Sequence, residues 1–130
     1  MLSRVLPLNL NTARIFVRDI TRAREFYAGT LGLKVNAHNL AQGYCVLSAG
    51  NCELVLEAVA FDAPAEEQRL VGRFTGLSFQ VPSVHVAHQD FVTRGVVFTG
   101  PPERQSWGGT LATLQDPDGN ELQIVQRGGA

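Results

Sequence analysis

The sequence predicts an α+β fold in which two βαβββ modules form a single domain, residues 1–130. Two observations support this prediction. The same order of patterns, one strand, one helix and three strands, occurs twice, at about 10–58 and about 74–127. A polar, proline-containing linker, 59–73, lies between the two occurrences. A chain of this length can bury one core but is too short for two independent domains.

The first module begins with a strand pattern at 12–17, where apolar and polar residues alternate. Asp19 then predicts the N-cap of an amphipathic helix that continues to a stop at Gly32. Glycine and asparagine separate the strand patterns that follow. These three strands are expected at 33–38, 43–49 and 52–58.

The second module repeats this order with little identity to the first. A strand with alternating apolar residues is expected at 76–81, and Ser83 predicts the N-cap of a helix that ends at Gly95. The remaining strands are expected at 96–100, 108–115 and 120–126.

A tight turn is predicted between the last two strands, at Asp116-Pro117-Asp118-Gly119. Pro117 fixes φ near −65°, and Gly119 can adopt the positive φ that such a turn needs. The two aspartate side chains can accept hydrogen bonds from neighbouring backbone N–H groups. The motif alone indicates a hairpin and has little functional meaning.

The two cysteines, Cys45 and Cys52, are predicted to be free thiols. A turn centred on Ala49-Gly50 would pair Cys52 with Leu47 and Cys45 with Leu54, so that the thiols do not face each other. There is no C-x-x-C motif and no Cys/His cluster. We therefore expect small, buried, unreactive side chains.

Charge and hydropathy exclude several functional classes. The net charge is −1, and the 11 Lys and Arg residues are scattered, so neither nucleic acid nor an anionic membrane is an expected partner. No apolar run approaches the ~20 residues that a membrane-spanning helix needs. The N-terminal residues lack the pattern of a signal peptide, and the expected compartment is the cytoplasm.

Neither a catalytic constellation nor a histidine metal site is predicted. His85 and His88 are three residues apart, but their helical phase places them opposite the apolar residues Val84, Ala87 and Phe91. We expect them to face solvent. No Ser/His/Asp or Cys/His arrangement and no phosphate-binding glycine loop is present.

Three stretches together resemble the vicinal oxygen chelate superfamily, which includes glyoxalase I, bleomycin-resistance proteins, fosfomycin-resistance enzymes and extradiol dioxygenases. The stretches are FVRDITRAREFYAGTLGLKV near the start, LSFQVPSV in the middle, and SWGGTLATLQDPDGNELQIVQ near the end. They occur in the family's order and cover roughly 12–126. The resemblance implies two βαβββ modules whose curled mixed sheets surround a cavity.

The resemblance also implies where a metal ion would bind. Metal-using members supply one His, Glu or Gln ligand from each of four strands, and the equivalent positions here are Thr12, Val55, Gly76 and Gln123. Three of these residues are not ligands for a divalent metal ion, and one amide is a weak ligand. The chain therefore most resembles the metal-free, bleomycin-resistance-like members, and we expect neither metal nor cofactor. The alternative is a displaced divalent metal site that uses Glu57 with Gln123.

Strand parity and the resemblance give a candidate ligand-binding set. Its members are an arginine, two aromatic residues, a serine, an amide and a carboxylate, the chemistry of a pocket for a flat polar molecule. Two of them have a structural alternative, because Trp107 could pack within a long loop and Arg14 could pair with Glu57 or Glu121. The set is Arg14, Phe16, Ser78, Trp107, Gln123 and Glu57.

The leading functional hypothesis is a metal-free small-molecule binding protein that sequesters an aromatic or peptide-like compound, with a homodimer as the expected assembly. The second is an enzyme, a lyase, isomerase or dioxygenase with a displaced metal site or with acid–base chemistry by a glutamate. The third is a scaffold without a ligand. No catalytic residue is assigned. Whether the modules pair within one chain or exchange between two chains stays open.

Overall fold

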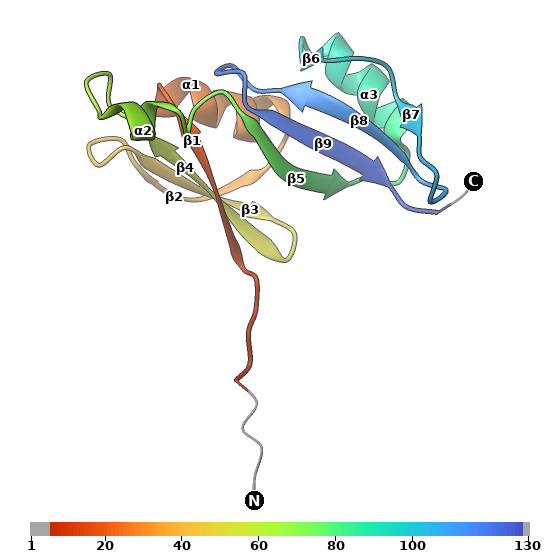
Figure 1. Ribbon diagram of the computed structural model, residues 1–130, viewed down its shortest axis with the longest axis horizontal. Coiled ribbons are helices and arrows are strands. Elements are labelled where there is room, and N and C mark those ends of the chain that lie inside the picture. Colours follow the sequence, from red (N-terminus) through yellow and green to blue (C-terminus); the bar gives the residue numbers. More distant parts are fainter. Residues whose placement is uncertain (1–5, 129–130) are drawn as a thin grey trace, which may run out of the picture.

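A computed structural model describes residues 6–128 and shows two mixed β-sheets, each with a helix packed on one face (Figure 1). The first sheet has the strand order β1-β4-β3-β2, and the second has the order β5-β9-β8-β6 with β7 beside β8. This confirms the predicted α+β fold of two βαβββ modules. The elements of the first module and of the linker are β1 (Thr12–Val17), α1 (Ile20–Arg24), η1 (Glu25–Thr30), β2 (Lys34–Asn39), β3 (Tyr44–Ala49), β4 (Cys52–Ala58) and α2 (Ala65–Gln68). Those of the second module are β5 (Phe74–Gln80), α3 (Val84–Thr93), β6 (Val97–Phe98), β7 (Glu103–Arg104), β8 (Thr110–Gln115) and β9 (Glu121–Gln126).

Each module closes its sheet in the same way. The opening strand runs parallel to the last strand of its own module, β1 to β4 and β5 to β9, and the helix provides the crossover. Both predicted N-caps are confirmed. The Asp19 side chain accepts hydrogen bonds from the backbone N–H groups of Thr21 and Arg22, and the Ser83 side chain accepts one from Val86.

The structure differs from the sequence prediction in its helices and short strands. The predicted first helix is α-helical only to Arg24 and continues as the π-helix η1, in which Leu31 donates to the carbonyl oxygen of Phe26. The linker contains the one-turn helix α2, whose Gln68 side chain donates to the carbonyl oxygens of Ala60 and Ala63. The strand expected at 96–100 is reduced to β6, and β7 was not predicted.

The predicted register of the β3–β4 hairpin was wrong by two residues. Cys52 pairs with Ala49, and Cys45 pairs with Leu56, because the turn lies at Gly50-Asn51. The positive φ of 68° at Gly50 explains this position of the turn. The cysteines remain apart as free thiols, and burial raises the pKa of the Cys45 thiol.

One hydrophobic core serves both modules. Buried residues of β1, α1, β3 and β4 form a single cluster with buried residues of α3, β8 and β9. The alternation predicted for the first strand is confirmed, because Ile15 and Val17 are fully buried in this cluster. The modules therefore form one packed unit within the chain.

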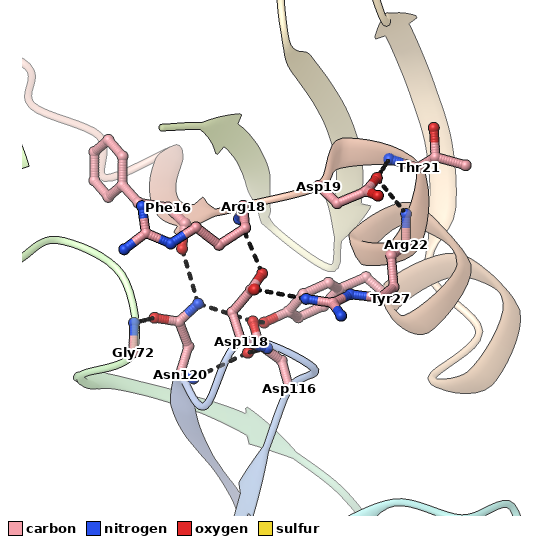
Figure 2. Close-up of polar contacts among 10 residues, drawn as sticks. All are labelled: Phe16, Arg18, Asp19, Thr21, Arg22, Tyr27, Gly72, Asp116, Asp118 and Asn120. Carbon is pink, nitrogen blue, oxygen red and sulfur yellow. Dashed lines mark hydrogen bonds and ion pairs between the residues drawn. The ribbon is translucent and has the colours of Figure 1, made fainter. Parts of the chain in front are cut away.

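The turn between β8 and β9 docks onto the first module through buried polar side chains (Figure 2). Asn120 is 1% exposed, and its amide nitrogen donates to the carbonyl oxygen of Phe16 at 2.8 Å and to the Asp116 carboxylate at 2.9 Å. Its amide oxygen accepts from the backbone N–H of Gly72 at 2.8 Å. One asparagine thus ties the turn to β1 and to the end of the linker.

The two aspartates of the turn make further contacts with the first module. The buried Asp116 carboxylate accepts from the Tyr27 hydroxyl at 2.8 Å. Asp118 pairs with Arg22 at 2.8 Å and accepts from the backbone N–H of Arg18 at 3.1 Å. As predicted, Gly119 has a positive φ, of 81°, but the sequence did not indicate that this turn joins the modules.

Burial, followed by repulsion from the Asp116 carboxylate, raises the pKa of Tyr27 well above its ordinary value of 10.0. Above pH ~10 the native state therefore holds a proton that the unfolded chain releases, and stability falls as pH rises.

We predict that Tyr27→Phe lowers the free energy of unfolding at pH 7 by about 1 kcal/mol and makes its decrease above pH 10 less steep. Urea denaturation between pH 7 and 11 measures both effects. Tyr44→Phe is the matched control, because Tyr44 is half-buried and its hydroxyl makes no hydrogen bond within residues 6–128. An unchanged alkaline slope in Tyr27→Phe would contradict this account.

Candidate functional site

Three residues of the predicted set meet on the open face of the first sheet. Along β1 the side chains of Arg14 and Phe16 lie on the face opposite the core, and the strand register places Glu57 of β4 beside Phe16. The Arg14 guanidinium pairs with both carboxylate oxygens of Glu57, at 3.1 and 3.2 Å, and its Cζ lies 5.1 Å from the centre of the Phe16 ring. The alternative of an internal Arg14–Glu57 pair is therefore observed.

Two further members meet on the second sheet. Ser78 of β5 and Gln123 of β9 are register partners on adjacent parallel strands. The Gln123 amide nitrogen donates to the hydroxyl of Thr113 on β8 at 3.1 Å. Thr113 was not in the predicted set, although the alternation of β8 places it opposite Gln123. The hydrogen bond fixes the amide with its nitrogen toward β8.

Trp107 lies apart from both groups, in the loop between β7 and β8. Its side chain is 55% exposed and packs directly over Gly109, where any Cβ would collide with the indole ring. The loop thus holds the ring at the end of the second sheet.

Two cavities lie between the modules. The larger, about 430 Å³, is mainly apolar and is lined by Leu31, Leu33, Phe79 and Phe91, with Ser78 as the one predicted residue. The smaller, about 220 Å³, lies between β1 and the segment 70–77 and is lined by Arg14 and Phe16. Within residues 6–128, neither of these two cavities is lined by all six predicted residues. Glu57, Trp107 and Gln123 line neither of these two.

The residues at the family's metal-ligand positions do not fit a divalent ion. Val55 and Gly76 have no donor atom in their side chains, and the Thr12 hydroxyl donates to Asn11. Gln123 supplies the only amide, and Glu57 is paired with Arg14. Within residues 6–128, no three His, Cys, Asp or Glu side chains come close enough together to hold a metal ion.

The two histidines of α3 have different environments. His85 is exposed, as expected, whereas His88 is half-buried and packs on the Phe98 ring with the ring centres 4.4 Å apart. The expectation that both face solvent was therefore wrong for His88. Contact of its imidazole with the ring of Phe98, in the short strand β6, accounts for this partial burial.

Sequence reasoning missed Arg73, which lines the smaller cavity with Arg14. The strand was expected to begin at 76, but β5 begins at Phe74, and its pairing with β9 shifts between Phe74 and Ser78. Gly76 has a φ of 74° at this irregularity. Because the alternation of side chains breaks at Gly76, the sequence pattern of β5 did not predict which face Arg73 lies on.

Comparison with known proteins identifies the class. Residues 9–124 match the model of the Glyoxalase/Bleomycin resistance protein/Dioxygenase superfamily, and the chain belongs to this superfamily. The expected resemblance is thereby confirmed at the level of family and fold.

Individual relatives agree with this assignment. The chain is 27% identical over 126 residues to the uncharacterized protein YraH of Bacillus subtilis (strain 168), covering 92% of this chain and 98% of YraH. A superfamily member from Sphaerobacter thermophilus DSM 20745 has a similar structure, with a TM-score of 0.78 at 26% identity over 95% of this chain and 100% of that chain. TnmS3, an antibiotic binding protein from Streptomyces sp. CB03234, has a TM-score of 0.74 at 24% identity over 95% and 98% of the two chains. At that identity the similarity to TnmS3 shows the fold alone.

Because the Arg14 and Glu57 side chains are 55% and 42% exposed, their ion pair contributes little to folding. We predict that Glu57→Gln lowers the free energy of unfolding by less than about 1 kcal/mol. Urea denaturation at 20 and 500 mM NaCl measures this, with Glu66→Gln on the exposed helix α2 as the control. A loss of several kcal/mol would show that the pair is a structural element.

Proposed function

We propose that this protein is a metal-free, small-molecule binding protein of the glyoxalase/bleomycin-resistance type that sequesters an aromatic or peptide-like compound. One observation carries the proposal. The family's scaffold is intact, but its four metal positions hold Thr12, Val55, Gly76 and Gln123, which do not form a divalent metal site. Polar and aromatic side chains occupy the same open faces of the two sheets.

The chemistry of these faces supports a flat, partly polar ligand. Phe16 offers an aromatic surface beside the Arg14 guanidinium, and such a pair can stack on a second ring. Ser78 and the Gln123 amide oxygen provide hydrogen-bonding groups on the other sheet. A few directed polar groups among apolar and aromatic ones are typical of small-molecule sites.

TnmS3, which is described as an antibiotic binding protein, has the same fold. For this chain an antibiotic is accordingly one class of compound worth testing. The cytoplasmic location expected from the sequence stays a prediction. Within residues 6–128, no helix is long and apolar enough to cross a membrane.

We predict that at least one member of a panel of aromatic and glycopeptide antibiotics raises the melting temperature, and that 5 mM EDTA leaves the shift unchanged. Phe16→Ala should weaken binding of that compound about tenfold, because aromatic anchors dominate such sites. Phe61→Ala is the matched control, since this ring is 97% exposed on the linker.

Two results would overturn the proposed function. One is indifference of the protein to every compound in the panel. The other is a stoichiometric metal ion in protein purified without chelator that is lost in Gln123→Ala, which would favour the enzymatic alternative with a displaced metal site.

We also propose that two copies associate, because the arm formed by residues 6–11 exposes apolar side chains. This arm extends away from the sheets (Figure 1), and Leu6, Leu8 and Leu10 are 71%, 91% and 89% exposed. Leucines at every second position place one apolar face along an extended segment. In a homodimer, a second copy of the chain would cover these exposed leucines.

Light scattering after gel filtration at 50 µM should give the mass of a dimer, and Leu8→Ser with Leu10→Ser should shift the mass toward that of the monomer. The loss of apolar contact area across the interface is the physical reason. Leu40→Ser is the control, because Leu40 is 60% exposed outside the arm. A monomeric wild-type protein would contradict the proposed assembly.

A further inference from the structure

The smaller cavity lies between residues of the first module, the linker and the second module. It lies beside β1, where Phe16 forms a bridge with Val71 and the Asn120 side chain donates to the Phe16 carbonyl oxygen. Residues of β1 and β5 flank the cavity, and β5 follows an irregular path around Gly76. The resulting space of about 220 Å³ is lined by side chains of both modules.

Two arginines, Arg14 and Arg73, are among the residues that line this space, and within residues 6–128 no acidic residue lines it. Arg14 and Arg73 are the charged residues among its walls, together with Thr75, Asn120 and apolar residues. Within residues 6–128, the Arg73 guanidinium makes no hydrogen bond or ion pair, although its backbone N–H is held by Asn120 at 3.3 Å. The backbone of Arg73 is thus held in place, and its guanidinium has no acidic partner within residues 6–128.

Arg14 also has N–H groups that make no hydrogen bond within residues 6–128. Its contacts with Glu57 use Nη2 alone, so that Nη1 and Nε have no partner within the described part of the chain. The ion pair is half-exposed and therefore weak, so a second anion can bind the same guanidinium. Glu57 orients Arg14 and offsets one of the two arginine charges, so that Arg73 leaves the cavity with a net positive charge within residues 6–128.

The edge of β1 adds a backbone donor. The carbonyl oxygen of Asn11 accepts from the N–H of Glu53 in β4, and that of Val17 accepts from the N–H of Val59, directly after β4. Since successive backbone groups of a strand point to opposite sides, the N–H of Arg14 points away from β4, toward the cavity. The cavity therefore combines two arginine residues with a backbone N–H that points toward it.

We propose that this cavity binds the carboxylate of the sequestered compound, with Arg73 and Arg14 as its ligands and the Phe16 ring against the adjoining aromatic group. This inference rests on the proposed function and narrows it to aromatic compounds that carry an acid group. Arg73 is a specificity-determining residue, because it has no acidic partner of its own within residues 6–128. Bidentate recognition of planar carboxylates is the geometry that guanidinium groups favour.

The test compares sodium benzoate with benzamide, a neutral molecule of nearly the same shape, in an NMR titration of the full chain. Arginine Nε–H signals report the binding position directly. We expect benzoate to shift the signals of Arg14 and Arg73 and to bind about tenfold more tightly than benzamide. Adding 500 mM NaCl should reduce this preference, because salt screens the charges.

Variants separate a binding role from a structural one. Arg73→Gln should abolish the preference for benzoate and leave the melting temperature unchanged. Arg104→Gln is the matched control, because Arg104 is exposed on β7 and does not line the cavity. Arg14→Gln should also reduce the preference, by removing the second guanidinium.

Three results would overturn the inference: equal affinity for the two probes, no shift of the Arg73 signal at 20 mM benzoate, or an unchanged preference in Arg73→Gln. These failures differ from a failure of the proposed function. A protein that binds uncharged aromatic compounds as well as benzoate keeps the proposed function and loses the carboxylate site. A protein that binds none of the antibiotics in the panel loses the proposed function as a whole.

Discussion

The structure depends on the burial of polar groups in the turn between β8 and β9. Asp116 and Asn120 are 5% and 1% exposed, and both find their hydrogen-bond partners in the first module or the linker. Within residues 6–128, no buried side-chain nitrogen or oxygen lacks a partner. Because an unpaired buried polar group is costly, the turn fixes the position of the second module on the first. It thereby sets the separation between β1 and β5 where the smaller cavity lies.

The open faces of the sheets show how a scaffold can keep its geometry and change its chemistry. The core faces of β1 and β9 carry Ile15 and Ile124, whose burial preserves the sheets whatever lies on the other side. Opposite them, Thr12 and Gln123 occupy metal-ligand positions without forming a metal site. Strand alternation places the residues that stabilise the core and those that face the open side on opposite faces of each sheet. The open face can therefore change without loss of the core packing.

Sequence reasoning succeeded where the information is local. Alternation and N-caps gave the strand faces, the two modules and the roles of Asp19 and Ser83, and the three family motifs gave the superfamily. It failed where distant segments decide the outcome. The part that Asn120 plays depends on Phe16, which lies 104 residues away. The place of Arg73 in the smaller cavity follows from an irregularity of β5 that no periodic pattern describes.

The single core has a consequence for how the duplicated architecture can vary. The apolar surfaces of the two modules form one shared core, and the turn between β8 and β9 completes its polar contacts on the first module. Deletion of one module would expose the part of the core that it covers. It would also leave the buried side chains of Tyr27 and Asn120 without hydrogen-bond partners in the other module. Substitutions in the shared core of one module therefore have to be matched by the other, whereas residues on the open faces can change independently.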